Sequence, residues 1–191
     1  MSEREISFIL ASASPRRQKL LAEAGYKFEV LPSDIDESDF SSESFSAEKY
    51  AEKLALAKAN NVAAKFPNRL VVGADTIVDF DGEIIGKAVD AEDAERITKK
   101  LFSSPHKVIT AIVIVRLVDG LELVESDTTI VYPKQMTAEQ IAEHINGKSW
   151  EGKAGAYAIQ ETGDEFVEKI EGSLTNVMGM PMELFDRMIK L

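Results

Sequence analysis

The sequence contains no cysteine. Disulfides, thiolate metal sites and cysteine nucleophiles are therefore excluded, and the composition agrees with a reducing compartment. Histidine is nearly as scarce, because the chain has only His106 and His144, far apart in the sequence. A histidine-rich metal site is not expected from two such residues. Any metal that the protein binds must be held by oxygen ligands.

Long hydrophobic runs are also missing. No apolar run reaches the length that spans a membrane, and no charged-then-apolar leader for secretion is recognisable. Hydrophobic residues make up 45% and charged residues 29% of the chain, as in ordinary globular proteins. We expect a cytoplasmic protein with no membrane partner, folded as one domain over residues 1–191 or as one domain with a smaller lobe.

Positive charge is in short supply. The chain has 22 lysines and arginines against 33 acidic residues, a formal net charge of -11. This charge opposes binding to the polyanionic backbone of nucleic acid, so long nucleic acid is not an expected partner. A local cluster of arginines and lysines can still be positive inside a negative molecule, and a small phosphate ligand is compatible with the composition.

The stretch SASPRR follows a short apolar segment, residues 6–11, that predicts a buried strand. Ser14 is a favourable N-cap and Pro15 suits the first helical position, so a helix is expected to begin here. Arg16 and Arg17 then fall in its first turn, where the helix dipole disfavours cations. Either a bound anion such as phosphate compensates, or both arginines are solvated or paired with acids elsewhere.

Strand and helix signals alternate along the rest of the chain. Strands are expected at residues 27–32, 69–87, 108–133 and 166–172, the second with an interruption at residues 73–76 and a hairpin turn at Asp81 and Gly82, the third as two strands joined by Asp119 and Gly120. Helices are expected at residues 47–66 and 90–102, after a capping box of Thr137 and Gln140, and from Pro181. The pattern predicts an α/β fold with a mixed sheet flanked by helices.

Asp75 stands out because it lies in the apolar stretch VVGADTIV, where an unpaired acid is costly to bury. A turn at a strand break is the structural alternative, but the apolar residues on both sides favour a functional acid. Asp36 and Glu37 lie in an acidic loop at residues 33–46. Together these three acids offer the oxygen ligands that magnesium prefers, and an unligated carboxylate can act as a general base for water.

Two lysines and one glutamine are further candidates. Lys58 lies on a helical stripe and Lys87 follows a glycine just after a strand, and each either snorkels to solvent or joins the arginines around phosphates. Gln160 is a polar residue among small ones that could read a base edge or be a hydrogen-bonded core side chain. The P-loop-like stretch GKSWEGKA ends in Ala154 where a magnesium-binding hydroxyl is required, so a Walker-type site is rejected.

Eight motifs occur in order over most of the chain: SASPRR (12–17), SDIDES (33–38), LALAKA (54–59), VVGADT (71–76), DGEIIGK (81–87), ITAI (109–112), GKAGAYAIQ (152–160) and NVMGMP (176–181). Together they resemble the Maf family. The resemblance implies an inosine triphosphatase-like fold, an elongated mixed β-sheet flanked by helices, in a single Maf-like domain with two lobes around a central cleft. It also implies a nucleoside triphosphate pyrophosphatase that releases a nucleoside monophosphate and pyrophosphate, in a house-cleaning role.

The resemblance assigns roles to nine residues of this sequence. The triphosphate would be held by Ser12, Arg16, Arg17, Lys58 and Lys87. Glu37 and Asp75 would bind a divalent cation, Mg²⁺ or Mn²⁺, or activate water, with Asp75 the favoured general base. Thr76 and Gln160 would help to recognise the base.

The motifs SPRR, ADT and AIQ resemble the subgroup that acts on dTTP, UTP and modified pyrimidine nucleotides rather than the one that favours 7-methyl-GTP. The chain departs from the family pattern at Ala88, Ala158 and Glu161, where proline and glycines are usual, and we expect the added side chains to narrow the pocket. A homodimer is implied by resemblance alone. The alternative is a nucleotide-sensing regulator linked to septum formation and cell division with little turnover, although such a sensor would not need both Glu37 and Asp75.

Overall fold

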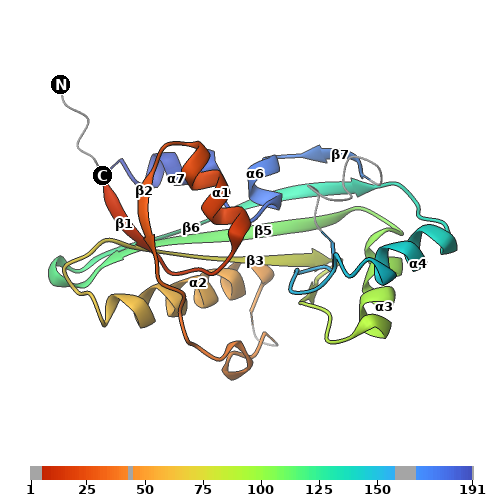
Figure 1. Ribbon diagram of the computed structural model, residues 1–191, viewed down its shortest axis with the longest axis horizontal. Coiled ribbons are helices and arrows are strands. Elements are labelled where there is room, and N and C mark those ends of the chain that lie inside the picture. The colour runs from red at the N-terminus through yellow and green to blue at the C-terminus, as the bar shows by residue number, and fades with distance from the viewer. Residues whose placement is uncertain (1–5, 43–44, 158–166, 191) are drawn as a thin grey trace.

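The structure is a computed structural model of the chain and describes residues 6–42, 45–157 and 167–190. The described strands form one mixed sheet of seven strands in the order β2-β1-β3-β5-β6-β7, with β4 paired to β3 (Figure 1). They are β1 (Ser7–Leu10), β2 (Lys27–Val30), β3 (Val71–Phe80), β4 (Glu83–Ile85), β5 (His106–Arg116), β6 (Leu121–Pro133) and β7 (Val167–Glu171). The predicted α/β class and mixed sheet are confirmed.

Helices cover both faces of this sheet. They are α1 (Pro15–Glu23), α2 (Ala47–Ala63), α3 (Ala91–Leu101), α4 (Ala138–Asn146), α6 (Leu174–Val177) and α7 (Met182–Met188), with short 3-10 turns η1 (Glu37–Asp39) and η2 (Leu117–Asp119). The predicted capping box is present, because Thr137 and Gln140 each bind the other's backbone N–H. The helix expected at residues 47–66 already ends at Ala63, and α6 was not predicted.

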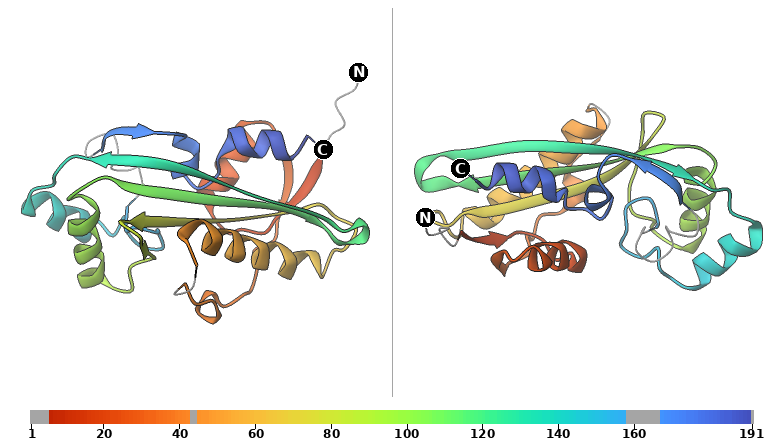
Figure 2. Two further views of the ribbon diagram at one scale, coloured as in Figure 1. Left: turned by 180° about the vertical axis from the view of Figure 1, so that it is seen from behind. Right: turned by 90° about the horizontal axis from the view of Figure 1, so that it is seen from above.

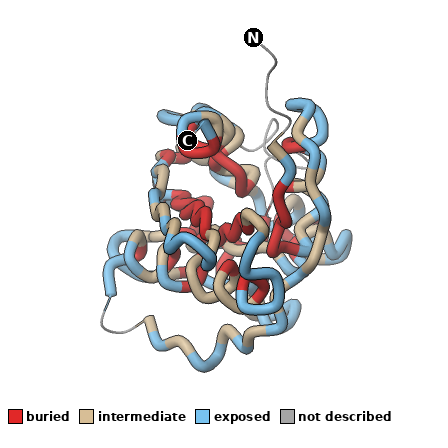
Figure 3. The backbone as a smooth tube through the Cα atoms, turned by 90° about the vertical axis from the view of Figure 1, so that its left-hand side faces the viewer, coloured by how far each residue is buried: buried red, intermediate tan, exposed pale blue. Residues whose placement is uncertain are grey.

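The core divides into three apolar clusters. One lies between the sheet and α2, and a second lies on the opposite face against α1 and α7. The third packs the carboxyl end of β3 and the amino end of β5 against α3. It lies at the end of the molecule where Figure 2 also shows α4. Buried residues, red in Figure 3, gather in the interior between these layers. Of the helices in the described part of the chain, none is both long and apolar enough to cross a membrane.

The interruption predicted at residues 73–76 is wrong, because β3 runs without a break from Val71 to Phe80. Gly73 serves helix packing instead of chain turning. A Cβ atom at this position would lie 2.4 Å from the carbonyl oxygen of Ala55 in α2. Glycine therefore lets α2 approach the strand closely, and Asp75 is held in regular, buried sheet.

The edge of β3 that faces away from β5 is only partly covered by the described strands. β1 pairs with it at Val71 and Val72, and β4 pairs with it again from Val78 onward. The stretch between these pairings carries Asp75 and Thr76. Because successive residues of a strand point to opposite faces, Asp75 faces the α2 side and Thr76 faces the α1 side.

Candidate active site

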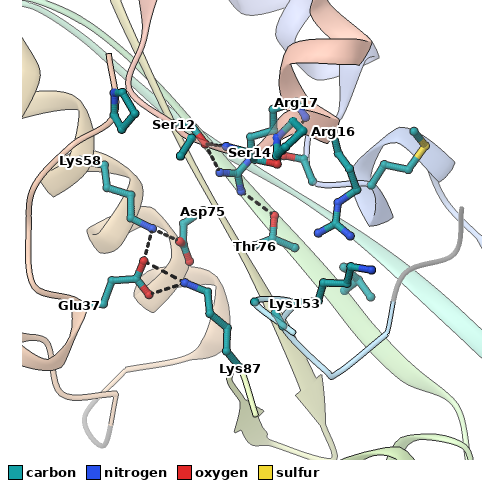
Figure 4. Close-up of a pocket in the computed structure, with 18 of the residues that line it drawn as sticks. Ser12, Ser14, Arg16, Arg17, Glu37, Lys58, Asp75, Thr76, Lys87 and Lys153 are labelled. Carbon is teal, nitrogen blue, oxygen red and sulfur yellow. Dashed lines mark hydrogen bonds and ion pairs between the residues drawn. The ribbon is translucent and has the colours of Figure 1, made fainter. Parts of the chain in front are cut away.

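A cavity of about 560 Å³ borders the uncovered edge of β3, a size typical of small-molecule sites. Its walls come from the turn between β1 and α1, the loop before α2, α2 itself, β3, and the segments 151–154 and 177–179. Figure 4 shows the charged side chains that these segments direct into it. Segments that are distant in the sequence thus meet at one gap in the sheet.

The amino terminus of α1 forms one wall. Ser14 caps the helix by accepting a hydrogen bond from the backbone N–H of Arg17, and Pro15 takes the first helical position, as predicted. The first turn contains no acidic residue. Arg16 and Arg17 therefore add their charges to the positive end of the helix dipole, which makes this wall favourable for an anion.

The two arginines have different surroundings. Arg17 is buried, and its guanidinium donates to Ser12 Oγ at 2.9 Å, Thr76 Oγ1 at 3.0 Å and the Gly179 carbonyl oxygen at 2.7 Å. All three acceptors are uncharged. Burial lowers the pKa of Arg17, and the nearby Asp75 carboxylate opposes this shift. Arg17 is thus a fixed positive charge at the cavity wall, whereas Arg16 is only half-buried and lines the cavity.

A chain of alternating acids and lysines forms the opposite wall. Lys58 Nζ in α2 lies 2.5 Å from Asp75 Oδ1 and 2.9 Å from Glu37 Oε1. Glu37 in turn pairs with Lys87, whose Nζ lies 3.2 Å from Oε2 (Figure 4). Asp36, the neighbouring acid, points elsewhere and accepts from Ser38 N and Oγ at the start of η1.

The two acids respond differently to their surroundings. Burial raises the pKa of Asp75, although Lys58 and Arg17 act in the opposite direction. Burial also pushes the pKa of Glu37 upward, but hydrogen bonds and charge from Lys58 and Lys87 outweigh it, and the Glu37 pKa is lowered. Asp75 is therefore the better proton acceptor of the pair, whereas Glu37 stays ionised.

The family model described as Maf-like protein matches residues 7–191. The chain belongs to the Maf family. Relatives in this family that share long alignments with it include a dTTP/UTP pyrophosphatase from Ruminiclostridium cellulolyticum, 41% identical over 96% of this chain and 95% of the relative. Another, from Geobacter metallireducens and also named dTTP/UTP pyrophosphatase, is 45% identical over 91% of this chain and 90% of the relative.

A solved structure supports the predicted fold. The Staphylococcus aureus Ham1 protein matches with a TM-score of 0.52, covering 96% of this chain and 98% of that chain at 14% identity. At this identity the likeness shows the fold alone. The inosine triphosphatase-like arrangement expected from the Maf motifs is thus confirmed as an architecture.

Eight of the nine site residues predicted from the Maf motifs lie together. Ser12, Arg16, Arg17, Glu37, Lys58, Asp75, Thr76 and Lys87 all line the one cavity. Gln160 lies outside the residues that the structure describes. Ser12 and Thr76 both contact Arg17, so their hydroxyls are engaged with a side chain of the site.

Lys153 lines the same cavity and was missed as an individual site residue. An antiparallel bridge between Lys87 and Ala154 holds its segment, together with a 3.0 Å hydrogen bond from Gly155 N to the Gly86 carbonyl oxygen. Lys87 and Lys153 therefore lie on two segments that are paired with each other. The motif GKAGAYAIQ contained the signal, because its lysine stands beside residues already linked to the family.

The acids in this Maf family member fit a divalent metal only with help from a ligand. In the described part of the chain, no cluster of three or more His, Asp or Glu side chains could hold a metal ion. Glu37 and Asp75 nevertheless converge on one cation, the ammonium of Lys58. Two carboxylates completed by phosphate oxygens and water match the coordination that Mg²⁺ prefers.

Proposed function

We propose that this chain is a nucleoside triphosphate pyrophosphatase that hydrolyses dTTP and UTP to the nucleoside monophosphate and pyrophosphate. The observation that carries the proposal is the set of four cations, Arg16, Lys58, Lys87 and Lys153, that line one cavity around the buried Asp75. Such a set suits a polyanion with a carboxylate beside it, and the names of the Maf relatives support the same chemistry.

In the proposed complex the triphosphate lies between the two charged walls. Arg16 and the amino terminus of α1 hold it from one side, and Lys58, Lys87 and Lys153 from the others. Arg17 contributes a fixed positive charge at the cavity wall, held in place by its hydrogen bonds to Ser12 and Thr76. The nucleobase would extend toward the apolar part of the cavity at Val78, Val108 and Tyr157. Thr76 and Gln160 would help to recognise it.

Asp75 is proposed to be the general base. It accepts a proton from the attacking water as the water oxygen bonds to the α-phosphorus. The bond from the α-phosphorus to its bridging oxygen breaks, and pyrophosphate leaves with the electron pair. Lys58, in contact with Asp75, stabilises the ionised carboxylate before the proton arrives.

Glu37, and Asp75 through the oxygen that does not accept the proton, would hold a divalent cation, Mg²⁺ or Mn²⁺, together with the phosphates. When bound, the cation supplies electrostatic stabilisation of the charge that develops on the leaving pyrophosphate. Lys58 and Lys87 keep Glu37 ionised, which favours such a ligand. The comparisons do not support the regulatory alternative, because the relatives described above carry the name of an enzyme.

Product analysis tests this proposal. The purified protein is incubated with Mg²⁺ and, separately, with dTTP, UTP, CTP, GTP or 7-methyl-GTP, and the products are resolved by ion-exchange chromatography. Monophosphate and pyrophosphate from dTTP and UTP are expected. Diphosphate and inorganic phosphate would contradict the cleavage position, and preferred turnover of 7-methyl-GTP would contradict the subgroup. No product from any nucleotide would refute the enzyme.

A further inference from the structure

Thr110 and Asn176 lie behind the cavity wall without lining it. Both are fully buried, with no exposed surface, and neither is among the residues that border the cavity. They are nevertheless connected to Arg17. Thr110 Oγ1 lies 3.0 Å from Thr76 Oγ1, and Thr76 Oγ1 accepts from Arg17 Nη2 at 3.0 Å.

The direction of each hydrogen bond in this series follows from proton counting. Thr110 donates to the backbone carbonyl oxygen of Asn176 at 2.9 Å. A hydroxyl has a single hydrogen, so Thr110 has none left for Thr76. Thr76 must therefore donate to Thr110, and its oxygen can only accept from the guanidinium of Arg17. The order Arg17, Thr76, Thr110, Asn176 is thus a directed relay from donor to acceptor.

The far end of the relay is anchored to the sheet. Asn176 Nδ2 donates to the Val108 carbonyl oxygen of β5 and to Thr129 Oγ1 of β6, both at 2.9 Å. Its Oδ1 atom is buried and makes no hydrogen bond within the described residues. An unpaired buried oxygen is destabilising, so the fold tolerates this residue at a cost, which agrees with a specific use for its N–H groups and its carbonyl.

The near end is fixed by sheet register. Thr76 and Thr110 are direct partners in the antiparallel pairing of β3 and β5, so their side chains share one face. A second contact closes the arrangement, because Arg17 Nε donates to Gly179 O, three residues beyond Asn176. Gly179 has a φ of 97°, and a Cβ there would lie 3.2 Å from Thr76 Oγ1.

We propose that Thr110 and Asn176 are positioning residues that hold the Arg17 guanidinium for polyphosphate binding by fixing the Thr76 hydroxyl as an acceptor. The residues act through Thr76 and touch no substrate. Without Thr110 Oγ1, the Thr76 hydrogen is no longer directed away from α1, and the hydroxyl can rotate so that its hydrogen faces the guanidinium.

The first test replaces Thr110 with the isosteric valine. For Thr110→Val we expect the KM for dTTP to rise about tenfold, the scale of a lost hydrogen bond to a charged group, and Thr110→Ser to restore it to within about twofold. A loss of folded protein alone lowers kcat and leaves KM unchanged. Thr98→Val is the matched control, because Thr98 is equally buried and, among the residues that the structure describes, its hydroxyl bonds only Ala94 O, in α3. An unchanged KM for Thr110→Val, or a similar rise for Thr98→Val, would overturn the proposal.

A double-mutant cycle tests the route through Thr76. Thr76→Val alone should raise KM, and adding Thr110→Val should change it no further, whereas additive effects would contradict the relay. If Thr110→Val does not fold, Thr110→Ala compared with Thr110→Ser decides in its place, because both lose the methyl group and only serine keeps the hydroxyl: a KM that rises in Thr110→Ala and not in Thr110→Ser supports the relay, and equal KM values overturn it.

The inference uses the proposed function for its KM readout, and a binding measurement separates the two. Calorimetry with inorganic pyrophosphate should show about tenfold weaker binding to Thr110→Val than to the wild type. If Thr110→Val binds pyrophosphate more weakly than the wild type but the wild type hydrolyses no nucleotide, the proposed function is refuted and the relay is retained. Normal dTTP hydrolysis by the wild type, with equal pyrophosphate binding by both proteins, would refute the relay and retain the function.

Discussion

Asp75 and Thr76 are neighbours in the chain, yet their side chains lie on opposite faces of β3 and line the same cavity. Asp75 contacts Lys58 of α2 on one face, and Thr76 contacts Arg17 of α1 on the other. Both can reach one ligand because β1 and β4 leave the strand edge between them uncovered. A single break in strand pairing thus brings the proposed base and the anion-binding wall together.

Replacing Asp75 with asparagine removes the proposed general base at constant volume. We expect kcat to fall by about 10²- to 10⁴-fold, the usual contribution of a positioned base, while the circular dichroism spectrum is unchanged. Asp79→Asn in the same strand is the control, because an asparagine oxygen can still accept from Gly82 N. Normal turnover by a folded Asp75→Asn variant would remove Asp75 from the mechanism.

The pH dependence of the reaction reports on Lys58. Asp75 must be deprotonated to accept a proton, so kcat/KM rises with pH through the Asp75 pKa, which burial has raised above the ordinary value of 3.8. Lys58 acts to lower that pKa. We therefore expect Lys58→Met to move the acid limb of the profile to higher pH.

Lys49→Met in the same helix is the control for this shift, because Lys49 is exposed and pairs with Glu52 away from the cavity. Its pH profile should match that of the wild type. An acid limb that stays in place in Lys58→Met, or moves to lower pH, would show that the limb reports on another group.

The sequence predicted the parts of the site that depend on local chemistry. Ser14 and Pro15 define the start of α1 by their own capping and backbone properties, and an acid within an apolar strand is conspicuous wherever the strand lies. Convergence of the motifs followed from the family resemblance. The two-lobed single domain and the homodimer stay predictions.

The sequence-based predictions were wrong or incomplete where the role of a residue depends on a contact with a distant part of the chain. Gly73 was interpreted as a break because nothing nearby shows that α2 approaches it, and the clash that explains it involves Ala55. Arg16 and Arg17 look equivalent in sequence, and they differ because Gly179, which lies 162 residues away, accepts from Arg17. Periodicity and propensity carry no information on such pairings.

The different surroundings of the two arginines predict different defects. Arg17→Ala leaves three acceptors at Ser12, Thr76 and Gly179 without their donor, and should lower the free energy of unfolding by about 2–4 kcal/mol as well as weaken binding. Arg16→Ala should lower the free energy of unfolding by less than Arg17→Ala, because Arg16 is only half-buried, and should raise the KM for dTTP about tenfold.

Urea unfolding and steady-state kinetics measure both effects of the arginine substitutions. Lys19→Ala on the same helix is the control, because its side chain is 61% exposed and pairs only with Glu23 among the described residues. It should alter neither quantity. Equal losses of stability in the two arginine variants would contradict the assignment of Arg17 as the buried, fixed charge.

His106 makes stability depend on pH, away from the acids of the cavity. Its Nε2 lies 2.7 Å from the Tyr157 hydroxyl, and burial lowers its pKa from 6.5 to about 4. The unfolded chain therefore binds more protons than the folded chain between these values, so stability falls as the pH drops from 6.5 to about 4. The full shift corresponds to roughly 3 kcal/mol.

Urea unfolding of the wild type and of His106→Gln isolates this contribution, because glutamine does not titrate and carboxylates affect both proteins equally. We expect the difference in unfolding free energy to be constant between pH 7 and 8 and to narrow below pH 6.5 as the wild type loses stability. A constant difference down to pH 5 would mean that His106 keeps an ordinary pKa in the folded protein, and that Tyr157 at the cavity wall is held by a histidine that accepts a proton without loss of stability.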